Sequence, residues 1–381
     1  MTGLRSRLIL AFVLVLIAAS GGVAWWFLRP KAEGPPKLEA VGFSDLPGWS
    51  QDDPGLAFAA YKRSCAKLAS LPLTTPMGFG KTVADWNAAC AGAAKARDAR
   101  AFFETNFTPY AIGRADGLVT GYYEPLLNGS RTRHGLYQTP VYGLPDDLVS
   151  IDLGQFRPEW KGESIAGRVE GHRLVPYASR AQIDAAPPGK ARVLFYGDDP
   201  VAVFFLHIQG SGRVWLDDGT MLRVNYAGQN GHPYTAIGRT LIRQGALTRE
   251  SVSMPAIRAW LKAHPNDARK VMESDASFVF FQEVPLGDPA LGPPGSEGVA
   301  LTPRGSVAVD NRFVPFGAPI FIAGDGLANL FVAQDTGGAI RGAARADIFF
   351  GYGAGAADAA GSLKAQARFF ILLPKHGSNG A

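Results

Sequence analysis

Residues 332–353 read VAQDTGGAIRGAARADIFFGYG, and this stretch contains two aspartates, Asp335 and Asp347, next to short apolar segments. Asp335 ends the apolar segment 330–334, because the Thr-Gly-Gly that follows predicts a turn. Asp347 precedes the apolar segment 348–350 and is expected to begin a strand. A carboxyl group beside phenylalanines and near a second carboxyl group is disfavoured in its charged form, which suits an acid catalyst. The alternative is that both are turn aspartates that accept backbone N–H bonds.

Residues 335–337 also spell Asp-Thr-Gly, the signature of aspartic proteases. Those enzymes need two such motifs whose aspartates share one proton, and this chain contains a single motif. A protease with one motif must dimerise around a small unit, which a chain with a second large domain does not suggest. An aspartic protease is therefore an alternative only.

Short apolar segments separated by turn residues continue on both sides of this stretch and predict a mainly β protein with accessory helices. The strands expected after residue 276 are bounded by Gly, Pro and Asp and lie at 277–284, 305–310, 318–324, 329–335, 346–351 and 368–374. Earlier strands are expected at 201–208 and 213–216, and His207 would then be a hydrogen-bonded residue of a sheet.

Helices are expected where apolar residues recur at helical spacing. Two of them precede the strands, near 54–70 and 82–106. A third ends at Gly245, and a fourth begins after Ser253 and stops at Pro265.

Composition is that of an ordinary globular protein. The 381 residues are 47% hydrophobic and 19% charged, which is enough for two packed domains. The net charge is +5, and the basic residues form no run typical of a nucleic-acid footprint. We therefore expect no nucleic-acid partner.

The N-terminus has the features of an export signal. Two arginines precede the apolar run 8–28, which is long enough to span a bilayer, and two tryptophans lie near its end, where interfacial residues anchor a helix. These features favour an uncleaved membrane anchor within residues 1–32. Cleavage near residue 20 or 24 is the alternative.

Cys65 and Cys90 are the two cysteines, and export places them in an oxidising compartment. Each lies on the apolar stripe of its own expected helix. A nearby histidine or a CxxC spacing, which a catalytic thiol or a metal pair would favour, is missing. We expect a disulfide that joins the two helices, with two buried free thiols as the alternative.

Other common catalytic patterns are absent from the sequence. The six histidines lack HExxH or i,i+4 spacing, and no serine lies in G-x-S-x-G. The segment GYGAGA at 351–356 resembles a dinucleotide loop, but too few residues follow it to complete a βαβ unit. We expect no metal and no cofactor, which leaves carboxyl groups as the catalytic candidates.

Six ordered motifs make the chain similar to a known family. They are GYYEPLLNGSRTRHGLYQTPVYGLP (121–145), LHIQGSGRVWLDDG (206–219), VNYAGQNGHPYTAIGRTLI (224–242), SFVFFQE (277–283), VAVDNRFVPFGAPIFI (307–322) and DTGGAIRGAARADIFFGYG (335–353). Together they resemble the membrane-bound lytic murein transglycosylase A family, over roughly residues 40–374. The last motif also resembles the 3D domain, named for three aspartates, of which the third would be Asp310.

The resemblance implies a double-psi β-barrel made from two separate parts of the chain, with a smaller β domain inserted between them and the glycan in the groove between the two domains. The N-terminal helices and the first part of the barrel would be residues 33–124. The inserted, substrate-binding domain would be residues 125–285, and the second, catalytic part of the barrel residues 286–381.

The resemblance also implies an enzyme that cleaves peptidoglycan glycan strands without water and leaves 1,6-anhydromuramic ends. By position, Asp347 is the acid and Asp335 the neighbouring carboxylate that tunes or positions it. An ordinary glycosidase needs two catalytic carboxyl groups, whereas this reaction needs one. The Asp-Thr-Gly motif is then a turn of the barrel that supports a glycan-cleaving acid.

Substrate contacts are expected from aromatic residues that stack on sugars and from polar residues that bind hydroxyl groups. The aromatic candidates are Tyr122, Tyr123 and Tyr226, with core packing as the alternative for each. The other candidates are Gln209, Gly210, Ser211, Asn230, Glu124 and Asp310. For Glu124 the alternative to a glycan contact is a hydrogen bond to the backbone at the start of the inserted domain.

The chain departs from the family in one respect. Family members are often lipoproteins with a cysteine directly after the signal, whereas the first cysteine here is Cys65. We expect the apolar N-terminal run to replace the lipid and to hold the protein in the periplasm of a Gram-negative bacterium. A different class of protein, a module that binds wall glycan without cutting it, would keep the aromatics and Gln209 but would not need Asp347.

Overall fold

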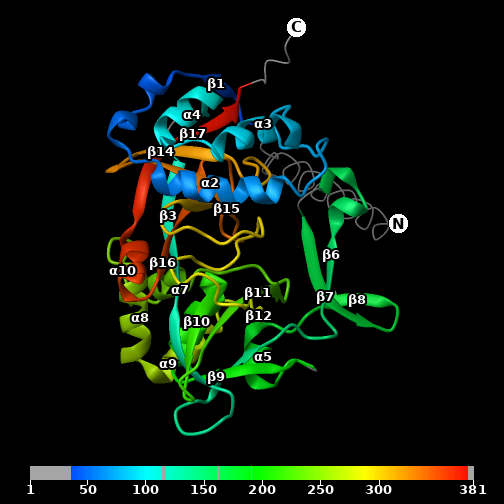
Figure 1. Ribbon diagram of the computed structural model, residues 1–381. Helices are drawn as coiled ribbons and strands as arrows, with labels where there is room; N and C mark the ends of the chain where they lie inside the picture. Colours follow the sequence, from blue (N-terminus) through cyan, green and yellow to red (C-terminus); the bar gives the residue numbers. More distant parts are fainter. Residues whose placement is uncertain (1–35, 114–116, 161–162, 190, 376–381) are drawn as a thin grey trace, which may run out of the picture. The chain divides into compact units, whose positions relative to one another are not determined.

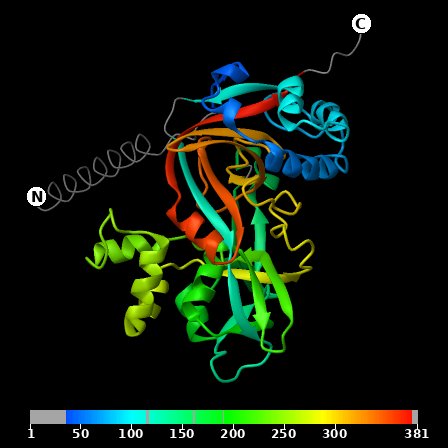
Figure 2. The same ribbon diagram turned by 60° about the vertical axis from the view of Figure 1, so that its left-hand side comes forward.

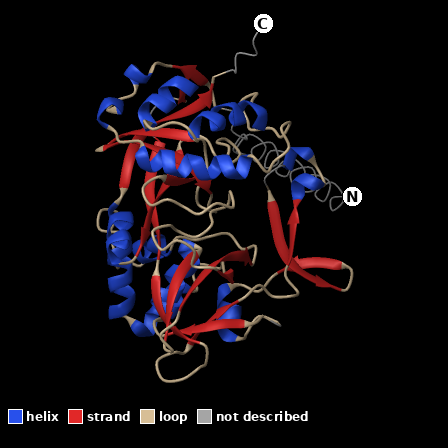
Figure 3. Cartoon of the chain, viewed as in Figure 1, coloured by secondary structure: helices blue, strands red, loops and turns tan. Residues whose placement is uncertain are grey.

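The computed structural model describes residues 36–113, 117–160, 163–189 and 191–375, which form a mainly β fold with several helices (Figures 1 and 3). The membrane anchor expected at residues 8–28 lies outside these ranges. Among the helices within them, none combines the length and apolar character that a membrane span requires.

The first sheet takes its eight strands from two distant parts of the chain. In pairing order they are β1 (Leu38–Ala40), β2 (Phe107–Ile112), β17 (Lys364–Pro374), β14 (Pro319–Gly324), β15 (Leu327–Asp335), β13 (Ser306–Val309), β16 (Arg345–Tyr352) and β3 (Gly117–Glu124). Because β17 pairs with β3 as well as with β14, the six strands from β17 to β3 close into a ring. Closure pairs backbone groups that would otherwise lie at open sheet edges.

Apolar side chains fill the space around these strands. In β14, Ile320, Phe321 and Ile322 are all fully buried, so the strand is covered on both faces and its sequence is continuously apolar instead of alternating. The same hydrophobic cluster includes residues of three N-terminal helices, which therefore pack on the first sheet.

These helices are α2 (Gly55–Leu68), α3 (Val83–Ala93) and α4 (Ala99–Asn106), preceded by the short helices η1 (Phe43–Asp45) and η2 (Trp49–Gln51). The single helix predicted at 82–106 is thus two helices. Asp98 starts the second one, because its carboxyl group accepts a hydrogen bond of 3.0 Å from the Ala101 N–H. Cys65 on α2 and Cys90 on α3 form a disulfide, with 5.4 Å between their Cα atoms.

The central part of the chain forms two further sheets. The six-stranded sheet has the order β12 (Val279–Val284), β11 (Met221–Gln229), β10 (Ser211–Leu216), β4 (Leu126–Ser130), β9 (Val193–Gly197) and β5 (Thr139–Tyr142). The three-stranded sheet consists of β6 (Val149–Asp152), β7 (Ser164–Glu170) and β8 (Arg173–Pro176), with η3 (Leu153–Gln155) and η4 (Pro158–Trp160) between β6 and β7.

The strand predicted at 201–208 is wrong, because these residues lie in helix α6 (Pro200–Gln209). Asp199 caps the helix through hydrogen bonds from the N–H groups of Val201 and Ala202. Pro200 occupies its first turn, and Gly210 ends it with a left-handed φ of 77°. The helix is apolar on nearly all sides because it is buried, so its sequence lacks the polar face that would have revealed the helical period.

The remaining helices are α5 (Arg180–Ala185), α7 (Ile237–Arg243), α8 (Met254–Ala263), α9 (Pro265–Met272) and α10 (Ala354–Ser362). Helices α7 to α9 pack with α6 in one hydrophobic cluster and form a helical group at the left of Figure 2. Ser253 caps α8 as predicted, through a bond from Ala256 N. Pro265 ends α8 but also begins α9, since proline is favourable in a first turn.

Helix α10 was not predicted, because its residues are small and show no apolar period. Their small size is what its packing against β3 and β16 requires. A Cβ added to Gly121 of β3 would lie only 2.7 Å from the Cα of Ala360 in α10.

Candidate functional site

Strand β13 brings the two aspartates of the opening motif close together. Its residue Ala308 pairs with Asp335 on β15 and with Asp347 on β16. Since neighbouring strands lie about 4.8 Å apart, the two Cα atoms are roughly 10 Å apart. Asp335 ends its strand as predicted, whereas Asp347 is the third residue of β16 and not the first.

Asp335 is held by four hydrogen bonds. Its Oδ1 accepts from the N–H and Oγ of Ser296 at 2.9 and 2.8 Å and from Thr336 N at 2.9 Å. Its Oδ2 accepts from the hydroxyl of Tyr122 at 2.9 Å. Burial raises the pKa of Asp335, although the bonds from Ser296 and Tyr122 oppose this by favouring the ionised form.

Asp347 has one occupied and one open carboxyl oxygen. Its Oδ1 accepts hydrogen bonds from Thr120 Oγ1 and from the Arg345 guanidinium, the latter at 2.7 Å. Arg345 also donates to Thr120 Oγ1 at 2.8 Å, so the three side chains bind one another. None of the described residues donates to Oδ2, and the side chain is 19% exposed. This oxygen is therefore free to meet a ligand.

The environment of Tyr122 links the two carboxyl groups. Its ring packs against Phe349, with 5.2 Å between ring centroids, as expected from the pairing of these residues on β3 and β16. Burial raises the pKa of Tyr122 well above its usual value, and the charges of Asp335 and Asp347 raise it further. Tyr122 is thus a neutral hydrogen-bond donor next to both aspartates.

Four residues of this site were not selected from the sequence: Thr120, Ser296, Arg345 and Tyr234. The charge of Asp347 contributes to a raised pKa of about 12 for Tyr234, after burial and Asp275. Arg345 lies two residues before Asp347 on the same face of a strand, which was a usable signal. Thr120 and Ser296 reach the site through pairing of distant segments, for which the sequence contains no local signal.

Two predicted glycan contacts lie inside the protein. Tyr123 is 2% exposed, and its hydroxyl accepts a 2.9 Å bond from Arg258. Glu124 is fully buried and binds Arg213 and Arg223 at 2.9 and 2.7 Å. The structure speaks against direct glycan contacts by either residue.

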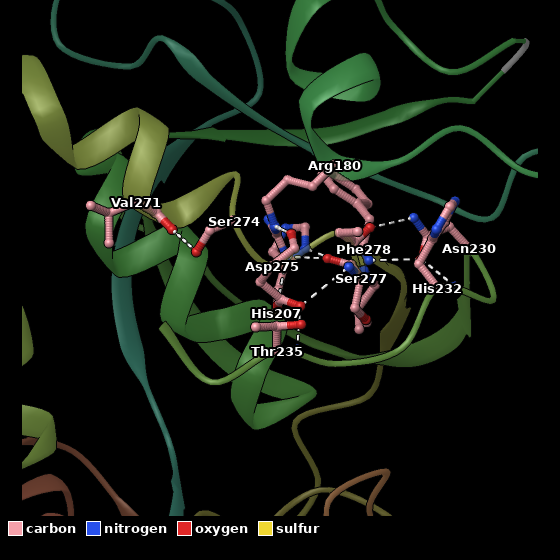
Figure 4. A network of polar contacts seen from close by, with 12 residues as sticks. Arg180, His207, Asn230, His232, Thr235, Val271, Ser274, Asp275, Ser277 and Phe278 are labelled. Atoms are coloured by element: carbon pink, nitrogen blue, oxygen red, sulfur yellow. Dashed lines mark hydrogen bonds and ion pairs between the residues drawn. The ribbon is translucent and has the colours of Figure 1, made fainter. Parts of the chain in front are cut away.

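Asn230 is also buried, within the polar network of Figure 4. Its amide donates to the carbonyls of Ala178 and Ala276 at 2.8 and 2.9 Å, and its oxygen accepts from Phe278 N at 2.9 Å. These bonds give Asn230 a structural role. His207 is buried as well, and its Nδ1 accepts from Val279 N at 3.3 Å, but it belongs to α6 and not to a sheet.

The other candidates differ in accessibility. Tyr226 is 46% exposed at an irregularity between β11 and β12 and is open to a ligand. Gln209 is partly buried and accepts from Tyr123 N at 3.0 Å, Gly210 ends α6, and Ser211 is buried in β10.

Asp310, the third aspartate of the motif set, supports the segment between the other two. It is buried, and its carboxyl oxygens accept from Arg312 at 2.9 and 2.7 Å and from Gly342 N at 2.8 Å. Gly342 lies between Asp335 and Asp347 in the chain. Asp310 therefore fixes this connection and is not exposed to a ligand.

The geometry decides between classes of acid chemistry. The two aspartates lie on strands separated by β13 and bind separate sets of donors, so they do not form a pair that shares one proton. Within the described ranges, no group of three or more His, Cys, Asp or Glu side chains is arranged to hold a metal ion. The site has one open carboxyl oxygen, on Asp347. The second carboxyl group, that of Asp335, is hydrogen-bonded to Tyr122.

Two family models match the chain, the MltA specific insert domain at residues 118–282 and the 3D domain at residues 305–373. Membrane-bound lytic murein transglycosylase A of Escherichia coli K12 is 32% identical over 272 residues, which cover 68% of this chain. The same alignment covers 66% of that protein, so the chain spans slightly less than two thirds of this relative's length.

Solved structures are similar over a greater length. A membrane-bound lytic murein transglycosylase from Agrobacterium tumefaciens has a TM-score of 0.80 and 34% identity, over 90% of this chain and 99% of that one. Escherichia coli MltA with bound chitohexaose has a TM-score of 0.65 and 26% identity, over 91% and 96% of the two chains.

Proposed function

The chain belongs to the membrane-bound lytic murein transglycosylase A family, and on this premise we propose that it cleaves the β-1,4 bond between N-acetylmuramic acid and N-acetylglucosamine in peptidoglycan without consuming water. The observation that carries the proposal is the arrangement at Asp347. One oxygen is held by Thr120 and Arg345 while the other is open, and Asp335, the neighbouring carboxyl group among the described residues, lies two strands away and does not share its proton.

In this reaction Asp347 protonates the glycosidic oxygen, and the bond from that oxygen to C1 of the muramic acid breaks. The resulting carboxylate then accepts the proton of the C6 hydroxyl as that hydroxyl attacks C1 of the same sugar. The product is a 1,6-anhydro ring. Because the nucleophile belongs to the substrate, the cost of capturing a second reactant is avoided. Asp335 keeps the site in place and acts on Asp347 through Tyr122.

We further propose that the first sheet is a double-psi barrel and that residues 125–285 form an inserted domain. The closed ring of six strands supports the barrel, and so does the origin of its strands before residue 124 and after residue 306. The strands of the other two sheets all lie between residues 126 and 284. The Escherichia coli relative holds chitohexaose. For this chain we propose a glycan strand between the two domains, in contact with Tyr122, Gln209 and Tyr226.

We also propose that the protein works in the periplasm, held by the apolar run 8–28. The run with its preceding arginines supports this, and the relatives are named as membrane-bound. Intact-mass analysis of protein extracted from membranes tests it. A mature chain that begins near residue 20 or 25 and is released in soluble form contradicts the anchor.

The activity is tested by digesting peptidoglycan and weighing the products. Ends formed by this protein should be about 18 Da lighter than hydrolytic ends, because no water is added. Asp347→Asn removes the transferable proton at equal size, so turnover should fall by about 10²–10⁴ while glycan binding persists. Reducing ends would indicate an ordinary glycosidase. Peptide cleavage would revive the protease, and binding without any product would indicate a glycan-binding module.

A further inference from the structure

The loop between β12 and β13 crosses the end of β15, where two consecutive loop residues bind two consecutive strand residues. Ser296 donates to Asp335 through both its N–H and its hydroxyl. The next residue, Glu297, donates its N–H to the Gln334 carbonyl at 3.1 Å. The position of Ser296 against Asp335 therefore depends on how firmly its neighbour is held.

The side chain of Glu297 attaches this part of the loop to helix α2. It is 7% exposed, and its Oε2 accepts from Ser64 Oγ on α2 at 2.7 Å. Ser64 in turn accepts from the Gln334 amide at 2.9 Å, so α2, the loop and β15 are joined through one carboxyl group. The other oxygen, Oε1, is buried and has no hydrogen-bond partner among the described residues. It lies against Gly317, where an added Cβ would be 3.2 Å away.

We propose that Glu297 is a positioning residue for the glycan-cleaving site: it fastens the loop to Gln334 and α2 and so keeps Ser296 bonded to Asp335. The inference rests on the proposed function and adds to it a residue that touches neither substrate nor Asp347. Buried polar groups are normally paired, and an unpaired carboxylate oxygen at 7% exposure is held there at a cost in stability. A role in holding the site accounts for that cost.

The strength of this fastening depends on protonation. Burial raises the pKa of Glu297 to about 7, although the hydrogen bond from Ser64, the nearby amide of Gln334 and the positive charge of Lys67 on α2 lower it. Arg63 on the same helix is bonded to the Ala59 carbonyl and to Thr302. Two further residues face Glu297, Gln334 on β15 and Gly317 in the turn before β14. Neither carries a charge.

The sign of the pH effect follows from linkage. The usual pKa of glutamic acid is 4.5, so the folded protein binds this proton more tightly than the unfolded chain. The stabilising contribution is complete below pH 4.5 and is lost as the pH rises to about 7 and Glu297 ionises. Above pH 7 the loop contains a buried charge with one unpaired oxygen, and the fastening is weaker.

The test uses Glu297→Gln, which keeps the size of the side chain and cannot ionise, with Glu39→Gln on the exposed strand β1 as the matched control. The measured quantity is the ratio of kcat/KM, variant over wild type, from pH 5 to pH 8.5. Ionisations common to both enzymes cancel in this ratio. We expect a ratio near one below pH 6 that rises about two- to tenfold through pH 7. The difference in unfolding temperature should rise from pH 5 to about pH 7, where the wild type loses the contribution of the bound proton, and the control should stay flat.

A second variant should change the kcat/KM ratio with pH in the opposite direction. Ser64→Ala removes a donor that favours the ionised form of Glu297, so its ratio to wild type should fall as the pH passes 7. It also keeps the inference testable if Glu297→Gln does not fold.

A double-mutant cycle separates positioning from general loss of stability. If Glu297 acts through Asp335, Glu297→Gln should change kcat/KM in the wild type but not in an Asp335→Asn background. Flat ratios for both variants, or equal effects in both backgrounds, overturn the inference. The proposed function stands in that case as long as the wild type yields anhydro ends, and it falls separately if the wild type does not.

Discussion

Tyr122 donates a hydrogen bond to Asp335, and the charge of Asp347 raises its pKa. The residues adjacent to Tyr122 in the sequence predict neither interaction. Burial first and the two carboxyl groups second raise its pKa, so the hydroxyl stays protonated over the whole range in which a carboxylic acid titrates. A phenol in this state donates a hydrogen bond but does not exchange its proton. It holds Asp335 in place, which agrees with our proposal that Asp347 is the group that transfers a proton.

Tyr122→Phe keeps the ring on Phe349 and removes only the donor. Asp335 then loses one of its four hydrogen bonds, and a bond to a charged group contributes about 1.5–3 kcal/mol. We expect kcat/KM to fall roughly ten- to a hundredfold, since about 1.4 kcal/mol corresponds to a factor of ten. Glycan binding should change little, because the ring, through which we propose that Tyr122 contacts the glycan, is kept and the lost hydroxyl is bonded to Asp335. Tyr110→Phe, on β2 away from the site, is the matched control, and a Tyr122 variant no worse than this control would contradict the role.

The sequence predicts Asp335 and Asp347 because their signals are local: a turn after one apolar segment and the start of another. Their partners are not local. Thr120 meets Asp347 across 227 residues through the parallel pairing of β16 with β3. Glu124 was expected at the edge of the glycan groove, but it is buried and bound by two arginines that are distant in the sequence. Residue types and turns can be predicted from short segments, whereas strand pairing depends on the whole fold.

At the scale of elements, the errors follow from burial. The strands predicted after residue 276 are all present as β12 to β17, because Gly, Pro and Asp mark their ends. Helix α6 was predicted as a strand because a fully buried helix and a buried strand have the same continuous apolar sequence. The cap at Asp199 and the glycine at 210 were the signals that distinguish them.

The disulfide joins two helices that pack on the first sheet, α2 and α3. It closes a loop of 25 residues, and the loss of its constraint on the unfolded chain costs about 3 kcal/mol. We expect the double variant Cys65→Ser, Cys90→Ser to lower the free energy of unfolding by about this amount in urea titrations and to keep its activity at 25 °C. Wild-type protein treated with a reductant should match the variant. Unchanged stability after verified reduction would show that packing alone holds the two helices.

At the scale of the whole described chain, one buried ion cluster connects the beginning and the end of the proposed inserted domain. Glu124 ends β3, and its partners Arg213 and Arg223 lie on β10 and β11 of the second sheet. The same two guanidinium groups donate to carbonyls of residues 286–292, where the chain returns toward β13. Arg213 also lies over the ring of Tyr352 on β16, 3.5 Å from its centroid. The cluster thus ties the strand that carries Asp347 to the second sheet.

Glu124→Gln tests this connection. The amide leaves two buried guanidinium groups without a countercharge, and breaking a buried ion pair in this way costs about 3–5 kcal/mol. Glu283→Gln is the matched control, because Glu283 pairs with Arg131 at the surface, where a salt bridge contributes at most about 1 kcal/mol. We expect urea unfolding at constant pH to show the large loss for Glu124→Gln only. Lower activity should accompany it, since β16 loses its tie to the second sheet. If the two variants lose equal stability, the connection between the sheets is made by apolar packing and not by the ion cluster.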